Sequence, residues 1–261
     1  MGASVEHHEH ESLSRPTNDA GEFSDHRSSL NVTINIRRVV RTLAVVIALI
    51  FVFGSAANLV SDYVAPSKEH KLARFLSRFD ITAELSIPNW YSSVSLLSAG
   101  ILLITIARAK YAERDRWRFH WLALGVVFVG LSIDEMTRFH EMSNTAMSWV
   151  VTGHGLLYYP WVIPALIFCG VIGLSYIPFL LHIERRSAVL FLVAGAIYVG
   201  GAVGMDAVGG DLAEHFGTQS LYPHFSEYVE ELFEDVGQLV FIYALLDYIR
   251  RHLPSIRFVV Q

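Results

Sequence analysis

Long apolar segments separated by short polar stretches dominate the chain from residue 39 onward. A transmembrane helix needs about 20 mostly apolar residues, because each residue rises about 1.5 Å and the hydrocarbon layer is about 30 Å thick. Six segments are candidates: 39–62, 88–108, 118–140, 156–182, 187–208 and 227–250. The pattern predicts an all-α fold, a polytopic transmembrane helix bundle with six transmembrane helices between residues 36 and 252.

The sixth segment is the least regular of the six. Its uncharged stretch, from Val236 to Leu246, is too short to cross a bilayer alone. It spans only if the acidic residues between 230 and 235 lie in the outer part of the membrane. The alternative is a short amphipathic surface helix and five spans, which would leave Arg250 and Arg251 on the outer side, against the positive-inside rule. We therefore expect six spans.

Basic residues divide unevenly between the two sides of the predicted bundle. Thirteen Lys and Arg residues lie before the first segment, in the second and fourth connections, and after the sixth segment, against five on the opposite side. Cytoplasmic loops carry the excess of Lys and Arg. Both termini are therefore predicted to be cytoplasmic (N-in/C-in).

The two terminal segments and the first outer connection differ in composition from the predicted spans. Residues 1–35 are rich in Ser, His, Glu and Asp, a composition that predicts a disordered cytoplasmic tail, and 253–261 is expected to be a second cytoplasmic tail. Near 68–79, in the first outer connection, Leu72 and Phe75 recur at helical spacing. That segment is predicted to be an amphipathic helix on the outer membrane surface.

Composition supports a membrane protein and narrows its function. The chain is 52% hydrophobic and 17% charged, with a net charge of −5, so nothing indicates a nucleic-acid partner. Its one cysteine, Cys169, cannot form an internal disulfide. The chain has no phosphate-binding glycine loop and no Gly-x-Ser-x-Gly elbow, which argues against nucleotide-binding and serine-hydrolase chemistry.

Carboxylates gather near the predicted outer ends of the third, fifth and sixth segments, although the positive-inside rule concerns Lys and Arg rather than acids. The stretch from Arg118 to Asp134 corresponds to about 24 Å of helix, so Asp134 and Glu135 are expected below the outer surface. An ionisable side chain at the bilayer centre costs up to about 2.5–3.5 kcal/mol. These acids are therefore expected to face the bundle or a water-filled cleft, paired with one another, with Arg138 or with a bound cation.

Helical spacing indicates which of these groups share a face. Asp134, Arg138 and Glu141 are related by i, i+4 and i+7, and Asp211 and His215 by i, i+4. Imidazole together with carboxylate is a ligand set of Zn, Fe and Mn sites, but the Glu-x-x-His spacing of di-iron bundles is absent from the three acidic segments. The candidate metal ligands are Asp134, Glu135, His140, Glu141, Asp211, His215, Glu231 and Glu234.

A plainer interpretation of these residues stays open. Glu141 and His215 also suit solvated ends of loops, and Arg138 could neutralise Asp134 or Glu141 in a structural salt bridge. In the fifth segment, Ala196-x3-Gly200-x3-Gly204 forms a small-residue ridge that would let a neighbouring helix approach closely. The pair at 209–210 is expected to end or kink that helix, so that residues 211–215 fold back over the acidic cluster.

Three functions are compatible with this pattern. The first is a membrane metalloenzyme in which the cluster holds Fe, Mn or Zn and acts on a lipid-like or amphiphilic substrate. The second is a cation- or proton-coupled transporter. The third is a non-catalytic membrane subunit whose cluster docks a partner. The inner halves of the third and fifth segments are almost entirely apolar, which argues against a polar pathway through the bundle.

Three motifs carry a resemblance. Leu131-Ser-Ile-Asp-Glu-x4-His-Glu141, Ile87-Pro-Asn-Trp-Tyr-Ser92 and Glu230-Glu-x2-Glu-x2-Gly237 resemble segments of a group of uncharacterised bacterial multi-pass membrane proteins. The resemblance covers the second, third and sixth segments. It implies a bacterial inner (plasma) membrane and brings no activity with it.

Overall fold

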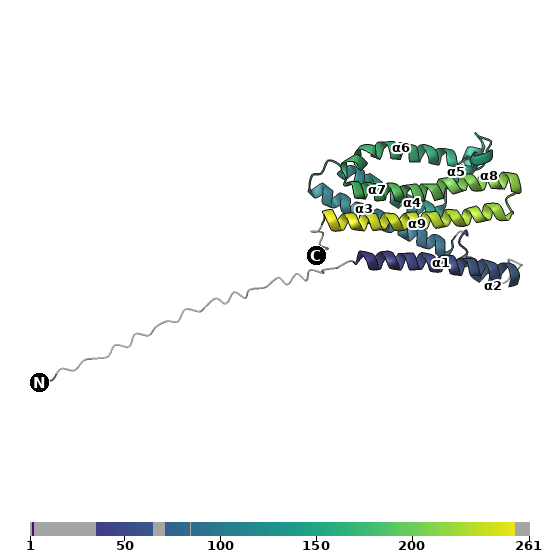
Figure 1. Ribbon diagram of the computed structural model, residues 1–261, viewed down its shortest axis with the longest axis horizontal. Helices are drawn as coiled ribbons and strands as arrows, with labels where there is room; N and C mark the ends of the chain where they lie inside the picture. The colour runs from purple at the N-terminus through teal and green to yellow at the C-terminus, as the bar shows by residue number, and fades with distance from the viewer. Residues whose placement is uncertain (1, 3–34, 65–70, 84, 254–261) are drawn as a thin grey trace. The chain divides into compact units, whose positions relative to one another are not determined.

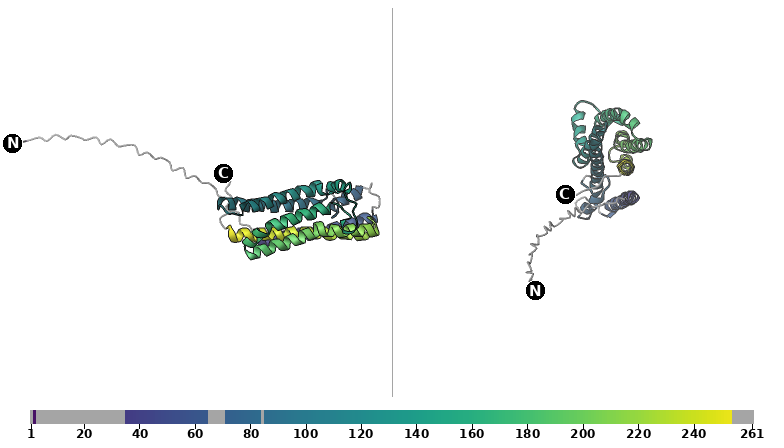
Figure 2. Two further views of the ribbon diagram at one scale, coloured as in Figure 1. Left: turned by 90° about the horizontal axis from the view of Figure 1, so that it is seen from above. Right: turned by 90° about the vertical axis from the view of Figure 1, so that its left-hand side faces the viewer.

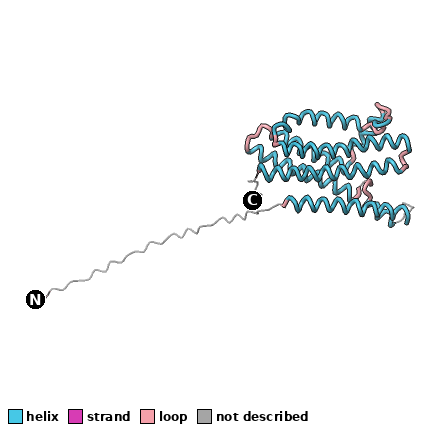
Figure 3. The backbone as a smooth tube through the Cα atoms, in the orientation of Figure 1, coloured by secondary structure: helices cyan, strands magenta, loops and turns pink. Residues whose placement is uncertain are grey.

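The computed structural model describes Gly2 and residues 35–64, 71–83 and 85–253, without the side chains of 61–64 and 141. All of these except Gly2 belong to one compact unit, residues 33–256. Figure 3 contains helices and loops but no strand among the described residues, which confirms the all-α fold. The tails predicted at 1–35 and 253–261 lie outside the described residues, apart from Gly2, Asn35 and Leu253.

The helices follow the apolar segments closely. In chain order the elements are α1 (Ile36–Val64), α2 (Lys71–Leu76), η1 (Ser77–Phe79), α3 (Ile87–Ala112), α4 (Arg118–Thr137), α5 (Phe139–Ser148), η2 (Gly155–Leu157), α6 (Val162–His182), α7 (Arg185–Val199), η3 (Gly200–Met205), α8 (Asp206–Phe216) and α9 (Leu221–His252). Among the described residues, five helices are long and apolar enough to cross a membrane: α1, α3, α4, α6 and the continuous run of α7, η3 and α8. By length and composition this is a membrane protein.

Helix α9 occupies the middle of the bundle. It packs against α1, α3, α7, η3 and α8, and Figures 1 and 2 show it running alongside these neighbours. The apolar core surrounds its C-terminal half, where Leu245 contacts a cluster that includes Trp121 of α4 and Phe179 of α6, all three at most 1% exposed. The N-terminal half of α9 carries five of its six acidic residues, and the sixth, Asp247, lies near its C-terminal end. The core and the acidic segment therefore occupy different halves of one helix.

Helices α3 and α4 form a tightly joined pair. Ser86 caps α3 by accepting a hydrogen bond from the Asn89 N–H, and Pro88 occupies its first turn, a position that suits proline. Further along, the Ser93 and Ser132 hydroxyls each donate to the other residue's carbonyl at 2.8 Å. These bonds fix the depth at which Asn89 of α3 meets the end of α4.

The third apolar segment does not continue to residue 140. Helix α4 ends at Thr137, Arg138 adopts a left-handed backbone with φ 54°, and α5 begins at Phe139. The spacing had predicted that Asp134, Arg138 and Glu141 share one face of a continuous helix. This prediction is wrong, because the helix ends between them. The break turns the chain so that the His140 N–H donates to the Asp134 carboxylate at 3.0 Å.

The fifth segment differs in the opposite way, because it is longer than predicted. It continues through η3, a π-helical turn, and through α8 to Phe216, and the break comes only at Gly217, whose φ is 86°. Gly209 and Gly210 lie inside α8, where a Cβ would come within 3.2 Å of Ser226 and 3.1 Å of Tyr158. They neither end nor kink this helix.

The small residues that allow close packing are also not the predicted ones. Nothing lies within 4 Å of a Cβ built on Gly200 or Gly204, whereas one built on Gly201 would meet the Phe233 Cβ at 2.8 Å and the Glu230 carbonyl at 2.9 Å. A π-helical turn adds a residue to the turn and so shifts which positions face a neighbour. Gly201 therefore brings η3 against the acidic half of α9.

The amphipathic segment predicted near 68–79 is described from residue 71. It forms α2 and η1, with Ala73 buried and Phe75 62% exposed. The Phe75 and Phe79 rings lie 5.6 Å apart. Its place on a membrane surface stays a prediction.

Candidate functional site

Side chains from α3, α4, α5, α8 and α9 enclose a polar cavity of about 630 Å³. We call it the acidic cavity, because six carboxylate residues lie in its lining: Glu135, Asp206, Glu227, Glu230, Glu231 and Glu234. Among the described residues, the lining contains one basic side chain that is permanently charged, that of Arg138, and one imidazole, that of His140. The acids reach the cavity from α4 and from the two consecutive helices α8 and α9, which are distant from α4 in sequence.

His140 is held in place by Asp134. The imidazole Nδ1 lies 2.7 Å from the Asp134 Oδ2, while Oδ1 of the same carboxylate accepts the His140 N–H. The His140 ring also packs against Trp161, with ring centroids 4.9 Å apart. Because Nδ1 is engaged, Nε2 is the ring nitrogen left for a ligand. A carboxylate that fixes the tautomer and orientation of a histidine in this way is the usual partner of a metal-binding imidazole.

Three of the cavity carboxylates have hydrogen-bond partners. Asn89 donates its side-chain amide to the Glu135 carboxylate at 3.1 Å and to the Glu135 carbonyl at 2.8 Å. The Trp161 indole N–H donates to Asp206, and His224 lies 3.1 Å from Glu227. The contacts with Asn89 and Trp161 fix Glu135 and Asp206 without neutralising them, since an amide and an indole carry no charge.

The other three acids have no such partner. Glu230, Glu231 and Glu234 accept no hydrogen bond and form no ion pair within the part of the chain that the structure describes. They are half-buried and face the acidic cavity from one turn of α9. Carboxylates gathered in a partly desolvated space favour a bound cation or shared protons.

Two side chains at the rim of the cavity add to this electrostatic picture. Burial lowers the pKa of the Arg138 guanidinium, while the nearby Glu231 carboxylate opposes that shift, and arginine remains charged in either case. Burial, together with the Asp206 carboxylate, raises the pKa of Tyr159 to about 12. Tyr159 therefore stays protonated at neutral pH and offers the cavity a hydrogen-bond donor.

The structure separates the eight candidate ligands into groups. Glu135, His140, Glu231 and Glu234 line the acidic cavity, and Asp134 lies behind His140. The Glu141 side chain lies outside the described residues. Asp211 and His215 are not part of the lining and contact each other instead, with the His215 Nδ1 2.8 Å from the Asp211 carbonyl. No three His, Cys, Asp or Glu side chains in the described part of the chain are already arranged as a metal site.

Several cavity residues were absent from the sequence-based candidates. Glu230 and Asp206 lie in the acidic segments that the sequence had indicated. Their predicted depth in the membrane was a signal that could have added them to the candidate residues. Trp161 and Tyr159 directly precede α6, and no local pattern in the sequence predicts that they lie near Asp206. Their role depends on how η2 and α8 meet.

A second cavity, of about 690 Å³, adjoins the first. We call it the apolar cavity, because aliphatic and aromatic side chains of α4, α6, α7 and α9 make up most of its lining. The two cavities share five lining residues: Glu135, His140, Trp161, Glu230 and Glu234. The pair forms a space that is polar at one end and apolar at the other.

Gln238 of α9 lies in the wall of the apolar cavity and is 1% exposed. Its side-chain amide nitrogen donates to the Ser92 hydroxyl at 2.8 Å, and Ser92 in turn donates to the Glu135 carboxylate. The Gln238 Oε1 is buried and has no hydrogen-bond partner among the described residues. A buried acceptor without a donor costs about 1–3 kcal/mol, so this oxygen marks a place for a ligand donor.

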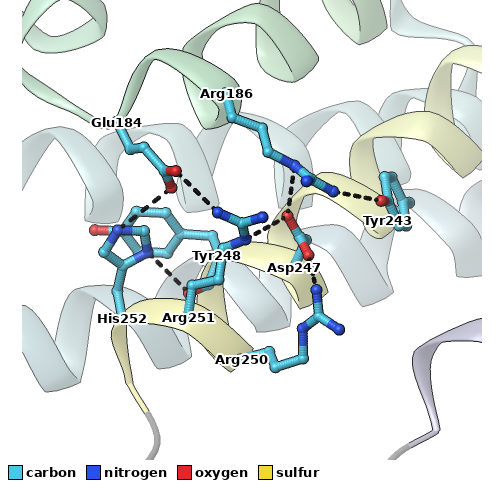
Figure 4. Close-up of polar contacts among 8 residues, drawn as sticks. All are labelled: Glu184, Arg186, Tyr243, Asp247, Tyr248, Arg250, Arg251 and His252. Atoms are coloured by element: carbon cyan, nitrogen blue, oxygen red, sulfur yellow. Dashed lines mark hydrogen bonds and ion pairs between the residues drawn. The ribbon is translucent and has the colours of Figure 1, made fainter.

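Figure 4 shows the opposite end of α9, where charges are paired. Asp247, 1% exposed, lies 3.2 Å from the Arg186 Nε and 3.1 Å from the Arg251 Nε, and it also pairs with Arg250. Glu184 accepts from Arg251 at 2.9 Å. We call this group the basic-end cluster. It joins the start of α7 to the end of α9.

Membrane-length helices packed around an acid-lined cavity define a helical membrane protein with an internal polar site. The chain belongs to the family described as "Domain of unknown function (DUF8692)", which matches residues 38–249. That match includes every residue named above for the acidic cavity. No curated protein matches the chain, and no solved structure matches it.

Proposed function

We propose that the protein is a membrane metalloenzyme that binds a divalent Fe, Mn or Zn ion in the acidic cavity and acts on an amphiphilic substrate. The observation that carries the proposal is the Asp134–His140 pair, which leaves Nε2 for a ligand in a cavity lined by Glu135, Glu231 and Glu234. Glu231 and Glu234 complete the site by rotation of their side chains. A bound metal would activate a water molecule or polarise a substrate oxygen.

The proposal includes a sixth membrane span, formed by α9. This helix has 32 residues, corresponding to about 48 Å, which exceeds the hydrocarbon thickness. Its acids lower its hydropathy, but Glu230, Glu231 and Glu234 line the cavity rather than the outer surface of the bundle. With six spans the Lys/Arg distribution favours both termini in the cytoplasm of a bacterial cell, with the protein in the inner membrane. Reporter fusions at residues 116, 150 and 255 would test this: cytoplasmic, external and cytoplasmic signals are expected, and an external signal at 255 would remove the sixth span.

Metal analysis of detergent-purified protein tests the site itself. The wild type is expected to retain one or two equivalents of Fe, Mn or Zn after dialysis. His140→Ala and Glu234→Gln should lose this metal, and Asp134→Asn should weaken binding about 10–100-fold, since it removes only the group that orients His140. Glu214→Gln is the matched control, because Glu214 is an exposed carboxylate paired with His154 and is not in the cavity lining.

Two results would overturn the proposal. One is wild-type protein that is folded yet neither contains metal nor binds added Zn²⁺, Mn²⁺ or Fe²⁺. The other is metal that remains in both the His140→Ala and the Glu234→Gln variants, which would place it elsewhere. In the first case the unpaired acids of α9 would favour the alternative of a cation- or proton-coupled carrier.

A further inference from the structure

The apolar cavity extends the acidic cavity into the part of the bundle expected to lie at membrane depth. Its lining follows α4 from Glu135 back to Leu124, which corresponds to about 16 Å of helix. Phe168 and Leu180 of α6 and Phe191 of α7 lie along the same space. Apolar walls of this kind favour an apolar molecule over water, so this part of the space suits a hydrocarbon chain.

Helix α6 forms the outer wall of this space and is only loosely attached. Only 11% of its membrane-spanning window is buried, and Leu174 and Leu181 are 71% and 82% exposed. A chain of a lipid-like molecule could therefore enter between α6 and its neighbours from the bilayer, without crossing water. The five residues shared by the two cavities then place the polar end of that molecule among the acids.

Gln238 specifies the chemistry at the junction of chain and headgroup. Its amide nitrogen is engaged by Ser92, so the free Oε1 can only accept a hydrogen bond. Gln238 follows Glu234 by one helical turn and lies on the same face of α9. A donor that satisfies Gln238 would therefore lie one turn from the acidic cavity.

We infer that the apolar cavity binds the hydrocarbon chain of a hydroxyl-bearing amphiphile, whose O–H donates to the Gln238 carbonyl while its polar end faces the acidic cavity. The inference specifies the substrate class of the proposed enzyme. It rests on that proposed function only in treating the bound molecule as a substrate. The binding itself needs no metal. The two claims can therefore fail separately.

The direct test compares hexadecanol with its methyl ether, which keeps the chain and removes the donor. Binding to detergent-purified protein would be followed by native mass spectrometry in the presence of a chelator. The wild type should bind the alcohol at least about fivefold more tightly than the ether, because only the alcohol satisfies the Gln238 oxygen. Gln238→Met, which keeps the length of the side chain and removes the acceptor, should abolish the difference.

A second pair of variants tests the cavity. A Cβ added at Gly173 of α6 or at Gly130 of α4 meets no atom within 4 Å, but only Gly173 lines the apolar cavity. Gly173→Leu should weaken binding of both molecules at least about tenfold by filling the space, and Gly130→Leu should leave it unchanged.

Three outcomes are decisive against the inference. Equal affinity of the wild type for alcohol and ether would mean that the Gln238 oxygen does not select a donor. Unchanged binding in Gly173→Leu would mean that the chain lies elsewhere, and no binding of either molecule would remove the lipid site. If the alcohol binds as expected but the protein holds no metal, only the proposed enzyme fails.

Discussion

At the C-terminal end of α9, Asp247 lies among Arg186, Arg250 and Arg251, whereas at the N-terminal end Glu230, Glu231 and Glu234 share a cavity with Arg138. Both ends carry charge in a partly desolvated setting. At the C-terminal end cations surround the acid, and at the N-terminal end acids outnumber cations by six to one among the described residues of the cavity lining.

The difference separates two uses of charge in the same helix. A buried ion cluster with every partner present holds elements together, although it adds little stability over an apolar core. A group of carboxylates without sufficient cations costs stability and is retained where a ligand needs it. We therefore assign a structural role to the basic-end cluster and expect ligand binding in the acidic cavity. Three stability measurements test this contrast.

The largest effect is expected at the basic-end cluster. Asp247→Ala removes a buried carboxylate that three arginines share, but these arginines are 33–62% exposed and water can hydrate them, so the expected cost is about 2–4 kcal/mol. Thermal and denaturant unfolding in detergent, followed by circular dichroism, would measure the loss. The control is Glu113→Gln, which removes the half-exposed partner of Lys110 and should cost less than about 1 kcal/mol. Similar losses in the two variants would contradict a structural role for the cluster.

A smaller effect is expected where η3 meets the acidic half of α9. Gly201→Ala places a methyl group 2.8 Å from the Phe233 Cβ and 2.9 Å from the Glu230 carbonyl, so the helices must separate. Overpacking of this kind costs about 1–3 kcal/mol. The same unfolding assay would compare it with Gly200→Ala, whose methyl group meets open space. The contact with α9 would be disproved if the two variants had equal stability.

The smallest effect is expected in the acidic cavity, and it has the opposite sign. Glu234→Gln removes one of several like charges and should leave stability unchanged or raise it by about 1 kcal/mol, at the expense of ligand binding. Unfolding would be measured on chelator-treated protein, so that the change in stability reflects the lost carboxylate charge and not a lost cation. A loss as large as that of Asp247→Ala would mean that Glu234 is a structural partner, and the contrast between the two ends would disappear.

The sequence predicted much of this arrangement, because helix formation in a membrane depends on local composition. Apolar runs of sufficient length gave the helices, and the clustering of acids pointed to α4, α8 and α9. The prediction of shared faces failed at Arg138, since a single left-handed residue ends α4 and no pattern in the sequence marks it. It failed again at Gly200 and Gly204, where the π-helical turn shifts the packing face to Gly201.

Periodicity and charge alone therefore determined that the chain is helical and suited to a membrane, and that its acids concentrate near one set of helix ends. These are properties of short segments, fixed by hydrophobic transfer and helix geometry. Only the tertiary structure decided that Asp134 orients His140, that Asp211 and His215 lie outside the cavity, and that Gln238 has a free carbonyl beside an apolar space. Such facts depend on how distant helices meet, because hydrogen-bond partners and cavities are set by three-dimensional packing rather than by neighbours in the chain.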